Sequence, residues 1–266
     1  MSERIGFIGL GAMGHPMVDC LLNAGHSVAS FVHRRREAMD ALKPKGLIEV
    51  SGTSELAKQT DIVMSIVVDE AQSDAVFRGR HGVLEHLKPG SVIMLMSTIS
   101  PEYCQQLAYE AREKHIQVLD CPVSGGTERA ARGELSLICG GETETVERCR
   151  PTLEAMGHVH HCGAIGMGQI VKLANQALIT STFRLVSEAR AMAEAHGMDL
   201  EQLMTVLRQA TGNSFVVENW DLLSGQWAHL APLASKDLNL FVAAAQKKDV
   251  NSTLIAEAAR LMESPQ

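Results

Sequence analysis

A lysine and two amide side chains on one predicted helix are the residues best suited to move a proton and to hold a small substrate. In the segment GMGQIVKLANQ, residues 166–176, the residues Lys172, Asn175 and Gln176 stand at positions i, i+3 and i+4. That spacing places side chains on one face of a helix. The lysine lies among apolar residues, and removing an amine from water disfavours its charged form, so it could exchange a proton near neutral pH. We therefore take Lys172 as a candidate general acid or base.

A glycine-rich turn near the start of the chain could bind phosphate groups. Gly9, Gly11 and Gly14 form the pattern GxGxxG directly after a strand-like run and directly before a helix-like run. In a dinucleotide-binding turn the first glycine permits the tight turn, the second lets the backbone approach a pyrophosphate, and the third lets helix and strand pack closely. The N–H groups at the helix start then bind the anion. The alternative is a glycine-rich turn without a ligand. The predicted cofactor-binding turn comprises Gly9, Leu10, Gly11, Ala12, Met13 and Gly14.

The second predicted strand indicates which dinucleotide is bound. An NAD site usually has an acidic residue about 20 residues after the turn, which binds the ribose 2′-hydroxyl. Residues 20–36 contain no acidic residue and end in His33-Arg34-Arg35-Arg36. A guanidinium can bind a 2′-phosphate through two charge-assisted hydrogen bonds. We therefore expect NADP to be preferred, with NAD still possible, and with Arg34 ahead of Arg35 and His33 as the phosphate ligand. The alternative is a solvated basic start to the next helix.

Two further segments carry polar groups that could form sites. The run DCPVSGG, residues 120–126, follows a predicted strand, and its Ser124, Gly125 and Gly126 could aim a hydroxyl and two N–H groups at a carboxylate. The alternative for this segment is an ordinary loop. His158, His160 and Cys162 would share one face of a strand, but no second cluster of metal ligands accompanies them, so we expect no metal site.

These segments need a scaffold, and the first 160 residues alternate strand-like with helix-like runs. That alternation is typical of a parallel sheet, in which a helix connects each pair of strands. The strand candidates are Ile5–Ile8, Ser27–Val32, Ile62–Val67, Val92–Met96, Gln117–Leu119, Leu135–Cys139 and His158–His161. The helix candidates are Met13–Ala24, Arg35–Leu42, Ala71–Phe77, Glu102–Lys114 and Thr143–Met156.

The pattern becomes entirely helical after Gly168. A segment from Gln169 to about His196 contains no proline or glycine and predicts one long helix. The fold class is therefore α/β, with a Rossmann-type doubly wound sheet over residues 1–164 and an all-helical domain over residues 165–266. Because the helical domain has little core of its own, we expect a homodimer or homotetramer. The further helix candidates are Leu200–Gln209, Phe215–Leu223, Ala234–Lys247 and Thr253–Met262.

Composition excludes several classes of protein. With 24 basic and 31 acidic residues the net charge is −7, which argues against nucleic-acid binding, and only 4% of the 266 residues are aromatic. The longest apolar runs, such as Val92–Met96, are far below the ~20 residues of a membrane span. The start of the chain lacks a signal-peptide pattern, and its six cysteines form no Cys-x-x-Cys pair. We expect a cytoplasmic protein with reduced thiols that binds neither nucleic acid nor membrane.

Five motifs together resemble those of the β-hydroxyacid dehydrogenase family, which includes 3-hydroxyisobutyrate dehydrogenase, tartronate semialdehyde reductase and L-threonate dehydrogenase, with 6-phosphogluconate dehydrogenase as a larger relative. They occur in the family's order from residue 5 to about residue 240. The motifs are IGFIGLGAMGHPM at 5–17, STISP at 97–101, DCPVSGG at 120–126, GxGxxxKxxNQ at 166–176 and SKDL at 235–238.

The resemblance implies a role for each matching position that faces the substrate. Lys172 would donate or accept the proton. Ser124, Gly125 and Gly126 would hold the carboxylate of the substrate. Asn175 and Gln176 would orient the substrate, although the family often has asparagine where this chain has Gln176.

The resemblance also implies further contacts to the cofactor. Thr98 would line the nicotinamide region, and Lys236 would approach the cofactor from the second domain. Val67 and Val68 match a segment whose backbone borders the cofactor, and here the chain departs from the Leu-Pro that the family often has.

The function implied is hydride transfer between NAD(P) and a small 3-hydroxy acid or its semialdehyde, with a lysine as general acid or base. The substrate would be a small carboxylate. The alternative is a non-catalytic dinucleotide-binding module in which binding promotes assembly. Lys172 argues against that alternative, because a binding module needs no proton carrier.

Overall fold

The computed structural model describes residues 3–34 and 36–263, and its contacts divide the chain into two compact units. The first unit is Met1–Lys172 and the second is Leu173–Gln266, so the division falls within one long helix. No helix among the described residues has both the length and the apolar content needed to cross a membrane.

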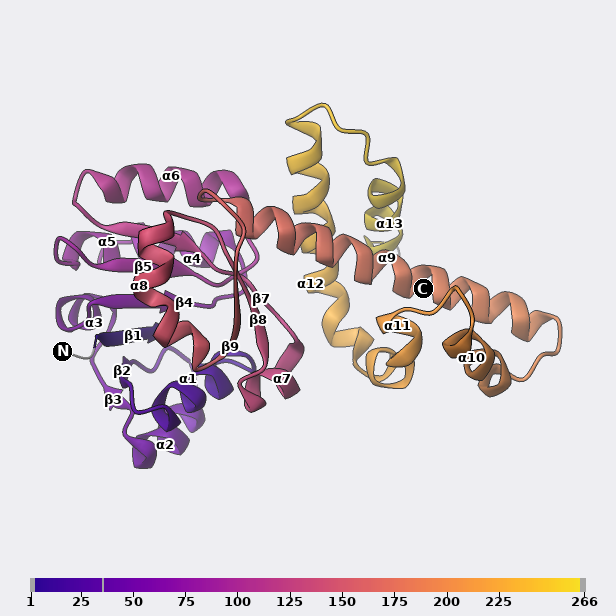
Figure 1. Ribbon diagram of the computed structural model, residues 1–266, viewed down its shortest axis with the longest axis horizontal. Coiled ribbons are helices and arrows are strands. Elements are labelled where there is room, and N and C mark those ends of the chain that lie inside the picture. Colours follow the sequence, from indigo (N-terminus) through magenta and orange to yellow (C-terminus); the bar gives the residue numbers. More distant parts are fainter. Residues whose placement is uncertain (1–2, 35, 264–266) are drawn as a thin grey trace. The chain divides into compact units, whose positions relative to one another are not determined.

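A six-stranded parallel sheet forms the centre of the first unit (Figure 1). In the strand order β3-β2-β1-β4-β5-β6, the chain first adds strands on one side of β1 and then, from β4 onward, on its other side. This is the doubly wound arrangement, in which ligands bind at the carboxyl ends of the strands where the order changes, here between β1 and β4. The predicted α/β fold class is confirmed. The strands are β1 (Arg4–Ile8), β2 (Ser27–Ser30), β3 (Ile48–Glu49), β4 (Ile62–Ser65), β5 (Val92–Leu95) and β6 (Gln117–Asp120).

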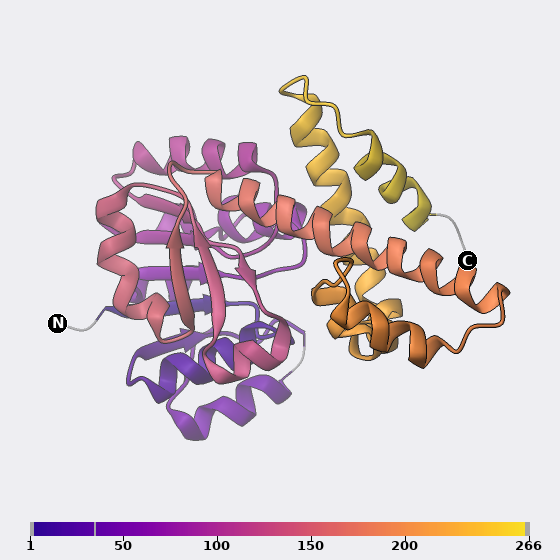
Figure 2. The same ribbon diagram turned by 45° about the vertical axis from the view of Figure 1, so that its right-hand side comes forward.

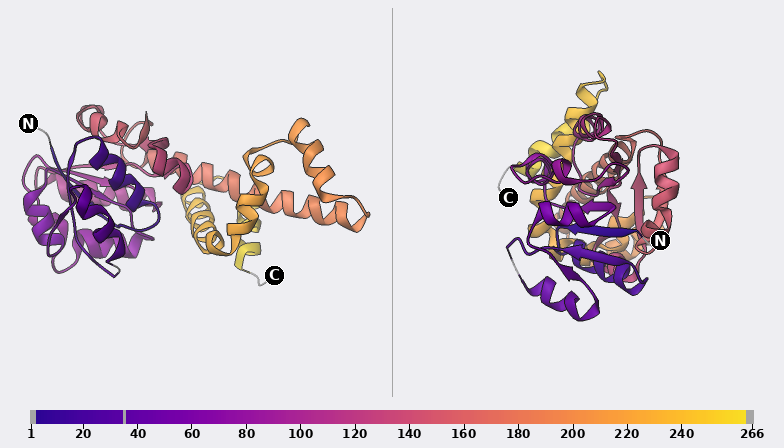
Figure 3. Two further views of the ribbon diagram at one scale, coloured as in Figure 1. Left: turned by 90° about the horizontal axis from the view of Figure 1, so that it is seen from below. Right: turned by 90° about the vertical axis from the view of Figure 1, so that its left-hand side faces the viewer.

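Both faces of this sheet are buried, as a parallel sheet requires (Figure 3). Ile5 and Phe7 of β1 pack into one core, whereas Ile8 packs into the other. The first face is covered by α1 (Gly14–Asn23) and α2 (Glu37–Leu42), which leads into the short helix η1 (Lys43–Lys45). The second face is covered by α3 (Thr53–Gln59), α4 (Glu70–Arg78), α5 (Val83–His86) and α6 (Pro101–Arg112).

A second, three-stranded sheet packs into the core on the α1 side, and Figure 2 shows its two longer strands side by side. The DCPVSGG segment forms its first strand, which pairs antiparallel with the second through Val123 opposite Leu137 and Ser124 opposite Ser136. Our sequence interpretation described this segment as a turn and did not anticipate the short strand, because its pairing partner is distant in sequence. The elements are β7 (Val123–Ser124), α7 (Gly126–Arg132), β8 (Leu135–Cys139), α8 (Thr143–Glu154) and β9 (Gly157–His161).

The second unit is helical throughout, as predicted, but one prediction about its helices is wrong. We expected separate helices at Phe215–Leu223 and Ala234–Lys247. Instead the first of these segments divides between α11 and the start of α12, and α12 runs unbroken from Trp220 to Gln246 through Gly225 and Pro232. Within this stretch Trp227 stacks on Phe183 with ring centroids 3.6 Å apart. Tertiary packing therefore overrides local propensity here. The helices are α9 (Met167–Ala195), α10 (Leu200–Gln209), α11 (Phe215–Glu218), α12 (Trp220–Gln246) and α13 (Thr253–Glu263).

Candidate active site

The glycine turn lies between β1 and α1, at the carboxyl end of the central strand. Gly9 has a φ of 104°, which residues with side chains rarely adopt, and a Cβ at Gly14 would clash with the carbonyl oxygen of Gly9. Gly11 is exposed, and nothing lies within 4 Å of where its Cβ would be. No side chain caps α1, and its first turn holds no acidic residue. The start of α1 therefore has N–H groups and space that suit a pyrophosphate.

Basic residues follow β2, and one of them, Arg36, is held by acidic neighbours. Arg36 donates to both carboxylate oxygens of Glu49 at 2.9 and 2.8 Å and lies 3.2 Å from Asp40. These bonds from Arg36, together with one from Lys43, lower the pKa of Glu49 to about 2. His33 and Arg34 are exposed, and among the described residues Arg34 makes no ion pair. Arg35 lies outside the described residues.

A hydrogen bond connects the segments that follow β4 and β5, near the glycine turn that follows β1. Val67 and Val68 follow β4, and Thr98 follows β5. The main-chain N–H of Val67 donates to the hydroxyl of Ser97 at 2.8 Å. Val68 is 54% exposed and Thr98 is half-buried. The carboxyl ends of β1, β4 and β5 meet at one edge of the sheet, so the predicted cofactor contacts of this unit come together there.

The Ser-Gly-Gly segment presents polar groups at the end of β7. Ser124 is half-buried, and Gly125 and Gly126 have φ values of 139° and 69°. Two successive residues with positive φ require glycine, and the turn leads directly into α7. Consecutive N–H groups in a glycine turn of this kind can bind a small anion.

Lys172 lies near the start of α9, and a buried carboxylate holds that start in place. Asp120, the last residue of β6, is fully buried, and its two oxygens accept from the N–H groups of Gly166 at 2.6 Å and Gln169 at 2.7 Å. Burial raises the pKa of Asp120, and these N–H groups offset part of that effect. Lys172 itself is 8% exposed. The sequence interpretation missed Asp120, although it opens the DCPVSGG motif.

In the second unit, a buried aspartate organises the two amides. Asp237 is 4% exposed; it accepts from Nε2 of Gln176 at 2.7 Å and lies 2.9 Å from Nζ of Lys236. Since a carboxylate accepts and does not donate, the amide of Gln176 must turn its NH₂ group toward Asp237. Nδ2 of Asn175 then donates to Oε1 of Gln176 at 3.2 Å. The structure thus links Asn175, Gln176 and Lys236 through Asp237, which the sequence interpretation also missed.

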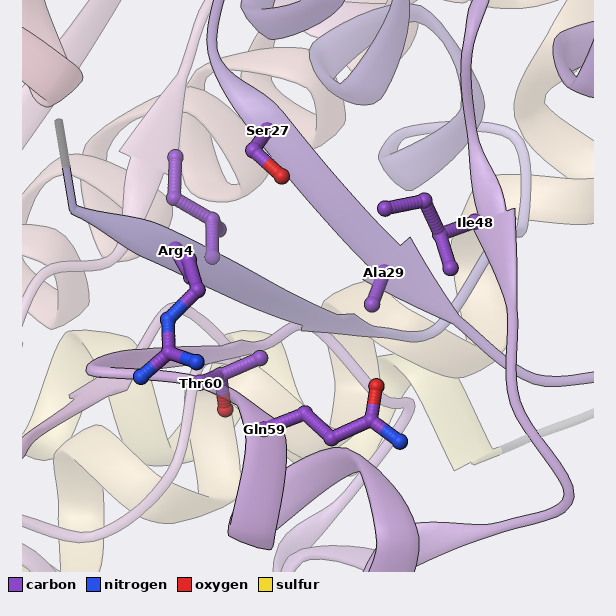
Figure 4. A pocket seen from close by; sticks show the side chains of 7 residues that line it. Arg4, Ser27, Ala29, Ile48, Gln59 and Thr60 are labelled. Atoms are coloured by element: carbon purple, nitrogen blue, oxygen red, sulfur yellow. The ribbon is translucent and has the colours of Figure 1, made fainter.

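The hollow shown in Figure 4 is not part of this site. It is lined by the first residues of β1 and β2, including Arg4 and Ser27, and by Gln59 and Thr60. Its volume is about 130 Å³, which is too small for a dinucleotide. Ligands of doubly wound sheets bind at the opposite, carboxyl ends of the strands.

Two family models match this chain, one in each part. The model that describes the NAD binding domain of 6-phosphogluconate dehydrogenase matches residues 4–168. The model described as NAD-binding of NADP-dependent 3-hydroxyisobutyrate dehydrogenase matches residues 166–266.

Individual proteins agree with these matches. The NAD-dependent L-serine dehydrogenase of Pseudomonas aeruginosa is 32% identical over 256 residues, which cover 92% of this chain and 86% of that protein. The structure of 3-hydroxyisobutyrate dehydrogenase from Salmonella typhimurium is 29% identical with a TM-score of 0.87, covering 98% of this chain and 93% of that one. The Mycobacterium tuberculosis 3-hydroxyisobutyrate dehydrogenase solved with L-serine is 28% identical with a TM-score of 0.84, at the same coverage.

Proposed function

Because this chain belongs to the β-hydroxyacid dehydrogenase family, we propose that it transfers a hydride between NADP and a small 3-hydroxy acid or its semialdehyde, with Lys172 as the general acid or base. The observation that carries this proposal is the placement of Lys172: a lysine that is 8% exposed, on a helix whose start is bonded to the end of β6. A lysine that serves only as a solvated surface residue would not require a helix start fixed by a buried carboxylate.

The proposed cofactor site is the turn Gly9–Gly14 with the segments that follow β2, β4 and β5. The open space at Gly11 and the uncapped start of α1 fit a pyrophosphate. Arg34 would bind the 2′-phosphate, with His33 and Arg35 beside it, while Val67, Val68, Thr98 and Lys236 would contact the rest of the cofactor. Relatives are described as NAD-dependent or NADP-dependent, so the preference for NADP rests on the basic segment and not on the similarity.

The proposed reaction assigns a separate task to each polar group of the chain. The hydroxyl of Ser124 and the N–H groups of Gly125 and Gly126 bind the carboxylate of the substrate. Nζ of neutral Lys172 takes the proton from the substrate hydroxyl during oxidation and returns it during reduction. A bound nicotinamide supplies the hydride acceptor or donor.

The two amides orient the substrate in this proposal. Asn175 is exposed and contacts the substrate, and Gln176, bonded to both Asp237 and Asn175, fixes the direction of the Asn175 amide. Orientation of this kind supplies a large part of an enzymatic rate enhancement.

The test is absorbance at 340 nm with a panel of 3-hydroxy acids and short semialdehydes, run with NADP and NAD in parallel. Serine and 3-hydroxyisobutyrate belong in the panel, because relatives are named for them or were solved with them. Turnover of at least one 3-hydroxy acid is expected. Tight binding of the dinucleotide without turnover of any member would instead support a binding module.

We also propose that the chain forms a homodimer or homotetramer. Leu178, Leu185 and Met192 are 70, 65 and 59% exposed and follow one another at seven-residue intervals along α9. Such spacing makes an apolar stripe, which isolated soluble chains rarely expose. Sedimentation should give a dimer or larger for the wild type and a smaller species for Leu185→Glu. A stable wild-type monomer would overturn the proposal.

The location we propose is the cytoplasm, since all six cysteines are free thiols, and a reducing compartment maintains such thiols. Fractionation of cells that express the tagged protein tests this, and recovery in a membrane or secreted fraction would contradict it.

A further inference from the structure

A buried glutamine connects the helix that carries Lys172 to the strand end that carries Thr98. Gln169 is fully buried in the first turn of α9. Its Nε2 donates to the carbonyl oxygen of Ser97 at 2.9 Å, and its Oε1 accepts from the N–H of Ile99 at 3.2 Å. Both ends of one amide therefore bond to the main chain on the two sides of Thr98.

The amide of Gln169 extends the hydrogen bonding of the sheet beyond the end of β5. The N–H of Cys121 donates to the carbonyl oxygen of Leu95 at 2.8 Å, which is the last bond between the β6 side and β5. The chain leaves the strand after Leu95, but the C=O group of Ser97 and the N–H group of Ile99 still point to one side of it, because one amide bonds to both. The amide of Gln169 supplies the donor and the acceptor that a longer β6 would have supplied at this point.

The main chain of Gln169 is bonded to the other strand end. Its N–H donates to Asp120, the last residue of β6, at 2.7 Å. The side chain thus holds the segment after β5, the main chain holds the end of β6, and Lys172 follows three residues later on the same helix. All of these contacts lie within the unit Met1–Lys172.

We infer that Gln169 is a positioning residue: it fixes the distance between Thr98, beside the nicotinamide, and Lys172, which exchanges the proton. This inference rests on the proposed function. Misplacement of a reacting group by about 1 Å can lower a rate about 10²-fold. Loss of the amide should therefore slow the reaction without weakening the binding of the cofactor, because the glycine turn at Gly9–Gly14 is not part of this bonding.

The experiment compares Gln169→Met with Thr60→Val. Methionine is similar in length and shape to glutamine but makes neither strong hydrogen bond. Thr60 also makes a buried bond from its side chain to the main chain, to the carbonyl oxygen of Leu56 at 2.8 Å, but it precedes β4 at the opposite edge of the sheet. For each variant we would measure kcat, the KM for both substrates, the Kd for NADPH and the thermal midpoint. Gln169→Met should lower kcat about 10- to 100-fold with the Kd for NADPH within about threefold of wild type, whereas Thr60→Val should lower only the thermal midpoint.

The outcomes separate this inference from the proposed function. An inactive wild type would overturn both. An active wild type with kcat of Gln169→Met within twofold of it, or with equal losses in Thr60→Val, would overturn the positioning role and leave the proposed function intact. If Gln169→Met does not fold, Gln169→Asn decides by the same measurements, since its shorter amide cannot reach both Ser97 and Ile99. Failure of both variants to fold would make Gln169 a residue of stability alone and would also overturn the inference.

Discussion

Glu49 accepts two hydrogen bonds from the guanidinium of Arg36, at 2.9 and 2.8 Å, and so removes that arginine from the set available to a cofactor. Arg34 is exposed, and among the described residues it has no such partner. The first prediction is therefore that Arg34→Ala lowers kcat/KM for NADPH. Loss of charge-assisted bonds to a phosphate costs about 1.5–3 kcal/mol, which corresponds to about 10- to 150-fold. Steady-state kinetics with NADPH and NADH should show the loss for NADPH only.

Arg36→Ala is the matched control for this prediction. This variant also removes an arginine side chain, but one that already pairs with Asp40 and Glu49. The ratio of kcat/KM for NADPH to kcat/KM for NADH should therefore stay near that of the wild type. A wild type that uses NADH as well as NADPH would contradict the prediction, as would an Arg34→Asp variant with unchanged efficiency for NADPH.

The contrast between these two arginines also shows what the sequence could predict. The glycine turn was identifiable because its signature is local: strand, three glycines and helix follow one another within Ile5–Asn23. The partner of Arg36 was not, because Glu49 belongs to a strand of two residues that pairs with β2 in the register Ser30 to Glu49. So short a strand has no periodicity of its own to detect.

The same distinction holds for the residues that support the candidate site. Lys172, Asn175 and Gln176 could be placed on one helix face from their spacing. Asp120 bonds to residues 46 and 49 positions away, and Asp237 to a residue 61 positions away. Such contacts exist only once the chain has folded. The residues proposed to do chemistry were therefore predictable, whereas those that hold them were not.

The second prediction concerns the proton. Lys172→Ala should lower kcat about 10²- to 10⁴-fold, the range typical of lost acid–base catalysis, because no other amine of the motif replaces it. The Kd for NADPH, measured by fluorescence titration, should remain close to that of the wild type. Lys58→Ala makes the same chemical change at an exposed position of α3 and should leave kcat unchanged. Full turnover by Lys172→Ala would exclude the lysine from the reaction.

The third prediction is a loss of stability in acid that Glu49 causes. Hydrogen bonds from Arg36 and then Lys43 lower the pKa of Glu49 from 4.5 to about 2 in the folded chain. The folded state therefore favours the ionised carboxylate, and this contribution to stability is present above pH 4.5 and is lost as the pH falls toward 2. Urea unfolding of wild type and Glu49→Gln should give free energies that differ most at pH 6, differ less at pH 3 and converge only as the pH falls to about 2.

Salt provides the control for that prediction. The side chains of Glu49 and Arg36 are 25 and 53% exposed, so ionic screening should reduce the difference between the two proteins at pH 6. A difference that persists unchanged at pH 3 would assign the effect of Glu49→Gln to something other than its charge.

The fourth prediction concerns the six free thiols, four of which are buried: Cys104, Cys121, Cys139 and Cys149. Burial raises the pKa of the Cys149 thiol to about 12, and it raises the pKa values of Cys104 and Cys121 as well. A disulfide reagent reacts readily only with a thiolate that it can reach, so the four buried thiols should be inert at pH 8. Titration of the folded protein with 5,5′-dithiobis(2-nitrobenzoate) should therefore detect at most the two half-buried thiols, Cys20 and Cys162. After denaturation the same titration should detect all six thiols. The double variant Cys20→Ser with Cys162→Ser should show no reaction while folded. Rapid reaction of any of its four remaining thiols would mean that the core around them opens to solvent.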